Sequence, residues 1–500
     1  MTRLRNNILA NFGGHTWAAM MGIAFVPVYI RVLGIEAYGL IGFFISLQVF
    51  FTVLDMGLSA TLNRELARHR HAGDGADIQR DLVRTLEWVY LPVGLLIAVG
   101  VFILSETVAS HWLNPVALSN ERAAHAIALM GLSAGLQWPC AFYAGGFRGL
   151  ERQVALNVIN AIFATLRFGG AAAVLLFLSP SLEAFLWWQV GVSALQTLAS
   201  GLILWRLLPK SVRMPAFNLD RLRDLRGFAV DLAALAALSF FLTQSDRILL
   251  STLLPLTEFG YYTLAASVAA ALSAVVQPFF TALYPRYSGL VASGNLQRLV
   301  DLYHPSNQML AVVVASTASV MAFFAEDLLR IWTQDPIIAS KSSPILSILV
   351  VGTGLNGLAN LPYALQLAYG WTRLALIQNA VSALIVLPAI WWSARGYGAI
   401  GAAIVCVALN LSYVVIGVPL MHRRLLPHEM WRWYLQDILP PTLAAVGAAG
   451  FFRLTVPQIS DGLSGAFSLG LVGLATLGCA ALASPYARQY ARLALARIPK

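Results

Sequence analysis

The sequence predicts an all-α polytopic membrane protein with about 14 transmembrane helices, arranged as two pseudo-symmetric six-helix bundles plus two C-terminal helices. Three observations support this fold class: a low charge content, long windows without any charge, and a one-sided distribution of Lys and Arg. Of the 500 residues, 58% are hydrophobic and only 11% are charged, whereas a soluble domain devotes about a quarter of its residues to charge.

The helices follow from the apolar windows and the breaks between them. Charge-free windows lie at 123–147, 184–205, 259–285, 302–325, 342–372, 396–422 and 462–487. Each can cross a hydrocarbon core of ~30 Å as a helix, and each is too long and continuous for a barrel strand. We expect spans at 8–30, 38–61, 85–107, 123–146, 154–178, 184–207, 227–253, 259–283, 306–329, 344–368, 375–394, 398–420, 437–456 and 463–484.

The basic residues predict the orientation. Of the 33 Lys and Arg residues, 25 fall in the termini and in alternate loops on one side, and only six fall in the opposite loops. Short loops rich in Lys and Arg remain in the cytoplasm. We therefore expect a cell (inner, cytoplasmic) membrane protein with both termini cytoplasmic, and a cytoplasmic loop at 62–84. This placement explains the net charge of +10 without a nucleic-acid partner. The three cysteines lie in separate apolar runs and have no metal or disulfide spacing.

A weak internal duplication appears at an offset of 221 residues. It aligns Tyr38-Gly39 with Phe259-Gly260, and Gly149 with Gly370. Six spans per copy give parallel repeats, a common plan among transporters. The predicted domains are an N-terminal six-helix bundle, a cytoplasmic connector, a C-terminal six-helix bundle, and two extra helices with a cytoplasmic tail. Their bounds are 1–207, 208–226, 227–420 and 421–500.

Two stretches carry a family resemblance. "PVYIRVLGIEAYGLIGFFISLQVFFTVLDMGLSATLNRELAR" (27–68) and "QSDRILLSTLLPLTEFGYYTLA" (244–265) resemble the bacterial polysaccharide transporters, the lipid-linked oligosaccharide flippases of the multidrug/oligosaccharidyl-lipid/polysaccharide (MOP) exporter superfamily. The resemblance implies twelve core spans in two six-helix bundles around a central cavity, two further spans common among the flippases, and alternating access. It does not identify the glycan.

The expected function is transport without chemistry on the cargo. We expect a flippase that moves a polyprenyl-diphosphate-linked oligosaccharide from the inner to the outer leaflet, for export of a cell-surface polysaccharide. A multidrug exporter coupled to a cation is the alternative, although that activity requires buried carboxylates more than buried cations. A membrane-embedded glycan polymerase is a remote alternative, because the outer loops at 179–183 and 254–258 are short.

Two arginines within predicted spans are candidate cavity residues for the anionic cargo. An ionisable group at the centre of a bilayer costs roughly 3 kcal/mol or more, so each needs a partner or a role. Arg167 lies near the middle of the fifth span, where it would either meet a diphosphate or acidic sugar or lock two helices together in a salt bridge. Arg247, in the outer half of the seventh span, would line the cavity or reach the outer headgroups.

Three further charged residues, Asp55, Asp246 and Arg64, are candidates for gating or for ion coupling. Asp55 lies in the inner third of the second span, where it would serve as a coupling-ion carboxylate, a partner for Arg167 or Arg64, or a cytoplasmic gate. Asp246 adjoins Arg247, but neighbours on a helix point about 100° apart and do not simply pair. A structural or gating pair with another span is the favoured interpretation for these two residues.

Neutral polar residues within the spans complete the candidate cavity. They are His15, Gln48, Gln137 and Asn356, which either join helices by modest hydrogen bonds or contact sugar hydroxyls. No cofactor or metal is indicated, and the sequence leaves open whether H+ or Na+ is a coupling ion. The expected partners are the lipid-linked oligosaccharide, membrane lipids, and a polysaccharide polymerase or glycosyltransferases.

Overall fold

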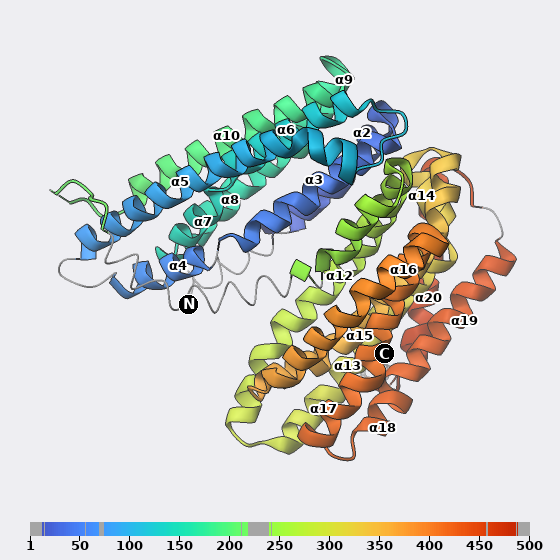
Figure 1. The fold of residues 1–500 in the computed structure, drawn as a ribbon. Helices are drawn as coiled ribbons and strands as arrows, with labels where there is room; N and C mark the ends of the chain where they lie inside the picture. The colour runs from blue at the N-terminus through green and yellow to red at the C-terminus, as the bar shows by residue number, and fades with distance from the viewer. Residues whose placement is uncertain are drawn as a thin grey trace, which may run out of the picture. The chain divides into compact units, whose positions relative to one another are not determined.

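The described part of the chain is helical apart from its connections and one isolated β-bridge between Asn114 and Pro255 (Figure 1). The computed structural model describes residues 13–486 and 488, except 15, 56, 70–74, 212, 219–239, 242 and 457–458. It divides into two compact units, Met1–Gly260 and Tyr261–Lys500. The point of division falls within helix α12 (Leu256–Ala292). The bounds of the four predicted domains therefore remain a prediction.

The first unit is built from helices whose ends carry clear local signals. Gly34, with φ of 84°, separates the first two, and the side chains of Ser119 and Ser181 accept hydrogen bonds from first-turn amides of α6 and α10. The elements are α2 Val26–Leu33, α3 Ile35–Val53, α4 Leu58–Arg68, α5 Gly75–Thr107, η2 Val108–Trp112, α6 Asn120–Gln137, α7 Cys140–Gly149, α8 Gln153–Ala164, η3 Thr165–Gly170, α9 Ala171–Phe177 and α10 Leu182–Leu207.

The second unit contains the longest helices. Asp335 caps α15 by accepting hydrogen bonds from the amides of Ile337 and Ile338, and Pro336 begins the helix. The elements are α12 Leu256–Ala292, α13 Leu296–Phe323, α14 Ala325–Thr333, α15 Pro336–Ala368, α16 Thr372–Ser412, η4 Tyr413–Gly417, α17 Val418–Leu425, α18 Met430–Arg432, η5 Trp433–Ile438, α19 Leu439–Thr455 and α20 Gly462–Ala483.

Eleven helices in the described residues are long and apolar enough to cross a membrane. Three expected spans are not separate members of that set. The stretch Thr372–Leu425 holds two spans, which join at Gly398 with φ of 57°. The expected span at 123–146 is divided into α6 and α7, and that at 227–253 lies partly outside the described residues. The fold class is confirmed, and the eleven helices are consistent with about 14 spans.

Two of the expected bounds were wrong. The second span is not one helix over 38–61, because α3 ends at Val53 and α4 begins at Leu58, after Gly57 with its left-handed φ of 69°. The loop expected at 62–84 is mostly helical, since α4 and α5 extend into it from both sides. Hydropathy predicts which residues lie in the hydrocarbon core, whereas a helix can continue beyond it. Helices α4 and α5 are therefore longer than their apolar parts.

The described part of the connector, residues 208–211 and 213–218, is irregular and lies along one face of α5. The backbone amide of Ala216 donates to Asp81 Oδ1 (2.7 Å), and that of Asn218 donates to Thr85 Oγ1 (3.0 Å). Ser211 Oγ donates to Asp77 Oδ1. Asp77, Asp81 and Thr85 are four residues apart and share a helix face. This face of α5 therefore positions the chain that follows α10.

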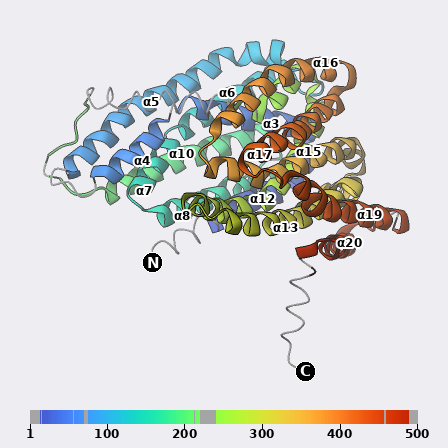
Figure 2. The same cartoon turned by 90° about the horizontal axis from the view of Figure 1, so that it is seen from below.

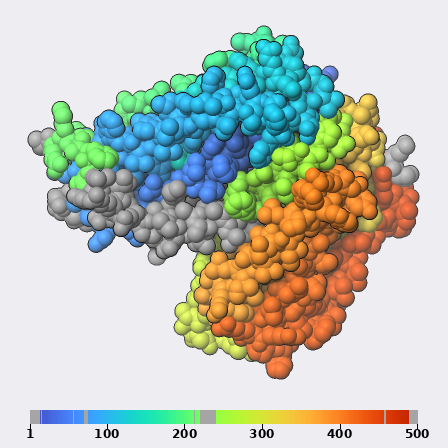
Figure 3. Space-filling view, in the orientation of Figure 1, coloured from blue at the N-terminus to red at the C-terminus, as the bar shows by residue number. Residues whose placement is uncertain are grey.

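A buried carboxylate fixes the chain between η2 and α6. Glu36, in the first turn of α3, accepts backbone hydrogen bonds from Val116 (2.7 Å), Ala117 (2.8 Å) and Leu118 (3.3 Å). Three amide donors compensate the charge of a buried carboxylate. Helices α5 and α6 pack against each other, and Figure 3 shows light-blue and cyan atoms of this part of the chain adjoining on the visible surface.

The two C-terminal helices α19 and α20 pack on α13 (Figure 2). Ion pairs join one end of this pair to α14. Arg453 Nη1 lies 2.6 Å from Asp327 Oδ2, and Arg330 bridges Asp327 Oδ1 (3.1 Å) and Asp461 Oδ1 (2.8 Å). Asp327 is buried, so its two arginine partners compensate a charge that would otherwise be costly.

The predicted repeat offset relates two helix starts that touch within the first unit. Helix α3 begins at Ile35 and α12 at Leu256, which are 221 residues apart. A Cβ atom at Gly39 would lie 2.6 Å from the carbonyl oxygen of Leu256, and one at Gly260 would collide with that of Ile35. The contact is reciprocal, since each glycine faces a backbone carbonyl of the other helix.

We predict that Gly39→Ala destabilises the protein, because the added methyl group meets backbone atoms that cannot move as a side chain can. The expected loss is about 1–3 kcal/mol, as for other overpacked sites, and it is measured by thermal unfolding of the purified protein. Gly191→Ala is the matched control, since no heavy atom lies within 4 Å of its Cβ position. Equal unfolding temperatures for both variants would contradict the close contact.

Candidate functional site

Arg167 lies in a π-helical turn near the middle of the fifth span. Within Gln153–Phe177, helix α8 passes into the π-helix η3 and then into α9. A π-turn interrupts the regular i→i−4 hydrogen-bond ladder, and such turns occur frequently at functional sites. The backbone at Arg167 is therefore open to donors from other helices.

Three successive carbonyl groups of η3 accept hydrogen bonds from side chains of two neighbouring helices. The bonds run from Trp188 Nε1 to Leu166 O (2.8 Å), from Gln189 Nε2 to Arg167 O (3.2 Å) and from Tyr29 Oη to Phe168 O (2.6 Å). Lipid tails offer no hydrogen-bond donors, so these side chains provide what water would provide elsewhere. They hold η3 against α2 and α10 in a fixed position.

Among the described residues, the guanidinium of Arg167 is bound only by neutral groups on α10. It donates to Gln189 Oε1 (3.3 Å), Ser193 Oγ (3.3 Å) and Gln196 Oε1 (3.1 Å). These acceptors are spaced i, i+4 and i+7 and so share one helix face. Ser193 Oγ lies 3.0 Å from Ser133 Oγ on α6. In the described part of the chain, no carboxylate is within ion-pair distance of Arg167.

This arrangement leaves a half-buried positive charge oriented but not neutralised. Amide and hydroxyl oxygens supply partial charge, whereas full compensation of a buried cation requires an anion. The salt-bridge alternative for Arg167 has no support among the described residues. An anion from outside the helix bundle, such as a phosphate or carboxylate group, would supply the missing counter-charge, and this role stays a prediction.

Asp55 lies in the break between α3 and α4 and is bound by hydroxyl groups. Its Oδ1 accepts from Tyr90 Oη and its Oδ2 from Ser59 Oγ (2.8 Å). Arg64, which is half-exposed, has Glu65 as an ion-pair partner at 3.0 Å. The structure thus gives Asp55 neutral partners, while its role in gating or ion coupling stays a prediction.

A second carboxylate of the first unit, Glu87 on α5, was not among the predicted site residues. It accepts from Trp205 Nε1 (2.6 Å) and Tyr143 Oη (3.1 Å), and it pairs with Arg84 Nη1 (3.0 Å). The guanidinium of Arg84 also lies 4.9 Å from the Trp205 ring centre. The pair Arg84 and Glu87 at the start of an apolar run was a usable signal, but the other two partners come from α7 and α10 and are distant in sequence.

The neutral candidates form pairs between helices. Gln48 Nε2 donates to Gln137 Oε1 (2.9 Å), which joins α3 and α6, and Asn356 Nδ2 donates to Asn410 Oδ1 (2.9 Å), which joins α15 and α16. Both pairs satisfy polar groups within spans, and contact with a cargo remains a prediction for them.

Three predicted site residues remain, Arg247, Asp246 and His15. Arg247 is half-buried and makes no hydrogen bond or ion pair with another described residue. Asp246 does interact with another group. His15 lies outside the described residues. Within the described ranges, no group of three or more His, Cys, Asp or Glu side chains is arranged to hold a metal ion.

The described helices define a class of protein, a multi-pass helical membrane protein, since eleven of them are long and apolar enough to cross a membrane. A family model described as "Polysaccharide biosynthesis protein" matches residues 4–291, and the MatE model matches residues 233–392. The first match covers more than half of the chain. The chain therefore belongs to the family described as "Polysaccharide biosynthesis protein", as the sequence resemblance indicated.

Individual relatives agree with this assignment. The chain is 20% identical over 420 residues to a Shigella flexneri protein named "Putative O-antigen transporter", covering 81% of this chain and 94% of that protein. It resembles the lipid II flippase MurJ in an inward closed conformation (TM-score 0.69, 12% identity, 95% of this chain and 97% of that one). It also resembles an inward-facing multidrug resistance MATE transporter (TM-score 0.66, 12% identity, 85% and 95%). At these identities, both structures describe the fold alone.

We predict that Tyr29→Phe destabilises the protein slightly, because the carbonyl group of Phe168 loses its donor within the membrane. A hydrogen bond between side chain and helix in a membrane protein contributes about 0.6 kcal/mol, measurable by thermal unfolding in detergent. Tyr397→Phe, at an exposed position, is the control. If the two variants unfold at the same temperature, Tyr29 does not support the π-turn.

Proposed function

We propose that this transporter flips a polyprenyl-diphosphate-linked oligosaccharide from the inner to the outer leaflet of the cytoplasmic membrane by alternating access. The observation that carries the proposal is the guanidinium of Arg167, held in mid-span by neutral acceptors and with no carboxylate partner in the described part of the chain. The diphosphate of such a lipid is a dianionic group, and a planar guanidinium binds phosphate oxygens through paired donors.

The physical requirement of flipping fits this site. A large polar headgroup must leave water while its lipid tail remains in the bilayer, so the protein has to offer both a charge partner and hydrogen bonds. Arg167 supplies the charge, and amide pairs such as Gln48–Gln137 supply groups that sugar hydroxyls bind. The similarity to a protein named as an O-antigen transporter supports the same cargo class.

The alternative is export of cationic drugs, which the MatE model match at residues 233–392 keeps in consideration. An organic cation entering near Arg167 would be repelled by a charge in a medium of low dielectric constant. The half-buried Asp55, which has only hydroxyl partners in the described residues, is the group that favours this alternative. The cation at mid-span makes the flippase the stronger proposal.

We predict that Arg167→Ala abolishes glycan export in a strain lacking the chromosomal gene, and that the lipid-linked glycan then accumulates on the cytoplasmic leaflet. Arg167→Lys keeps the charge and is expected to restore part of the export. Complementation is measured by surface glycan, and membrane insertion by the amount of protein in the membrane fraction.

Arg122→Ala is the control for these variants, because Arg122 is exposed in the first turn of α6 and should support normal export. Normal export by Arg167→Ala would refute the cargo role of this residue. Altered dye export with unchanged surface glycan, in the deletion strain itself, would favour the drug exporter.

A further inference from the structure

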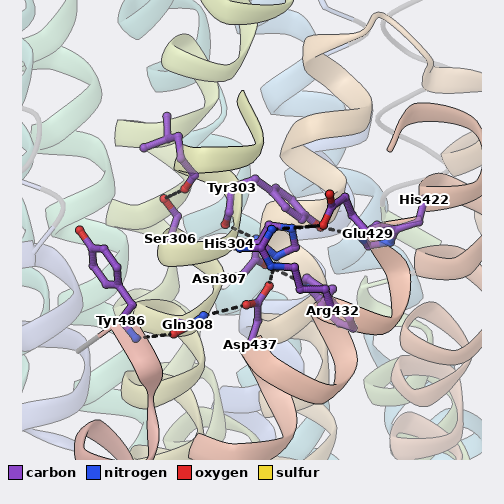
Figure 4. A network of polar contacts seen from close by, with 12 residues as sticks. Tyr303, His304, Ser306, Asn307, Gln308, His422, Glu429, Arg432, Asp437 and Tyr486 are labelled. Carbon is purple, nitrogen blue, oxygen red and sulfur yellow. Dashed lines mark hydrogen bonds and ion pairs between the residues drawn. The ribbon is translucent and has the colours of Figure 1, made fainter. Parts of the chain in front are cut away.

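A buried histidine lies between two carboxylates where α13 meets the start of the C-terminal helices (Figure 4). His304 Nδ1 contacts Asp437 Oδ2, and His304 Nε2 lies 2.9 Å from Glu429 Oε2. The side chains of His304 and Asp437 are 1% and 0% exposed, whereas Glu429 is 26% exposed. Asp437 belongs to η5, and Glu429 lies between α17 and α18.

We propose that His304, Glu429 and Asp437 form a proton-binding latch. With two protons bound, the latch holds the segment Glu429–Asp437 against α13, and the loss of one proton releases Glu429. This proposal does not depend on the cargo of the transporter, because it concerns only the attachment of the C-terminal helices.

The proton count follows from the two contacts. Each contact between a ring nitrogen and a carboxylate oxygen requires one hydrogen, since both atoms otherwise present lone pairs. Two protons therefore occupy the three groups, either on an imidazolium between two carboxylates or on a neutral imidazole and one carboxylic acid. When one proton leaves, one of the contacts becomes a repulsion between lone pairs and has to open.

The buried contact has additional support and is expected to remain. Asp437 Oδ1 accepts a hydrogen bond from Gln308 Nε2 (2.9 Å). The amide oxygen of Gln308 in turn accepts from Ser484 Oγ (2.9 Å) and from the backbone amide of Tyr486 (3.0 Å). This chain of bonds ties Asp437 to α13 and to the end of α20. The carboxylate of Asp437 is also shielded from solvent, so water cannot replace its contact with His304.

Glu429 is the group that can leave. It is partly exposed, and Arg432 Nη1 lies 3.5 Å from its Oε2, so a second partner is already in place. The released carboxylate would exchange a buried histidine for an exposed arginine and water. Two alternative arrangements with similar numbers of polar contacts make a switch that one proton can operate.

The neighbouring titratable groups do not supply the second proton. They are Tyr287 from α12, Tyr303 from α13, His422 from α17, Arg432 from α18, Tyr434 from η5 and Tyr486 after α20. His422 Nδ1 donates to the carbonyl of Val418 (3.0 Å), and its Nε2 accepts from Tyr303 Oη (3.3 Å). A neutral His422 satisfies both contacts, so His304 is the histidine whose contacts depend on two protons.

Backbone hydrogen exchange of the full-length protein in lipid nanodiscs tests the latch. Between about pH 5 and about pH 9, which bracket proton loss from histidine, we expect protection of residues 429–437 to fall about tenfold after correction for intrinsic exchange. That factor corresponds to one charge-assisted hydrogen bond. Residues 451–455, held by the Arg453–Asp327 ion pair, should keep their protection and serve as the internal control.

Glu429→Gln is the matched variant. A neutral amide donates to a bare ring nitrogen or accepts from a protonated one, so the contact survives and protection of 429–437 should not change with pH. Constant protection of the wild-type segment across this range would overturn the proposal by itself. The same pH-dependent loss in Glu429→Gln would overturn it as well, because the release would then not involve the carboxylate.

Discussion

Hydrocarbon offers no hydrogen-bond partners, so every polar group within a span has to find one inside the protein. The turn around Arg167 is shaped by this constraint. Its π-helical backbone exposes three carbonyls, and Tyr29, Trp188 and Gln189 each donate to one of them. The same amide of Gln189 binds both the backbone and the guanidinium of Arg167, so the cation is held in position by neutral groups.

Other charges of the fold meet the constraint differently. Glu36 is compensated by three backbone amides, and Asp327 by two arginines. These groups have fixed partners and hold loops and helices in place. Arg167 has oriented acceptors but no counter-charge among the described residues. A fixed cation without an anion is a structural cost that a transporter of anionic headgroups can recover on binding.

The sequence was sufficient for the fold class, because hydropathy is a local signal. It also marked Arg167 as a charge within a span, whose role as a binding residue stays a prediction. The offset of 221 residues even matched the starts of α3 and α12. The sequence alone only partly indicates the partners of Arg167. The spacing of Gln189, Ser193 and Gln196 places them on one helix face, but the structure is needed to show that Arg167 lies against this face.

Other features depend on tertiary contacts and lie beyond sequence patterns. The break between α3 and α4 needs the positive φ of Gly57, and the connector is held by a face of α5 more than 120 residues earlier. The His304 latch joins groups separated by 125 and 133 residues. No local pattern links such distant positions. The sequence shows only that Asp437 is an acidic residue at the start of an expected span.

Direct binding of a polyprenyl diphosphate to the purified protein tests the central claim, that Arg167 binds the anionic diphosphate of the cargo. We expect the wild type to bind this lipid at least about tenfold more tightly than Arg167→Ala, the difference made by one charged hydrogen-bond donor. Both proteins should bind the uncharged polyprenol equally. Equal affinity of the two proteins for the diphosphate would contradict the account.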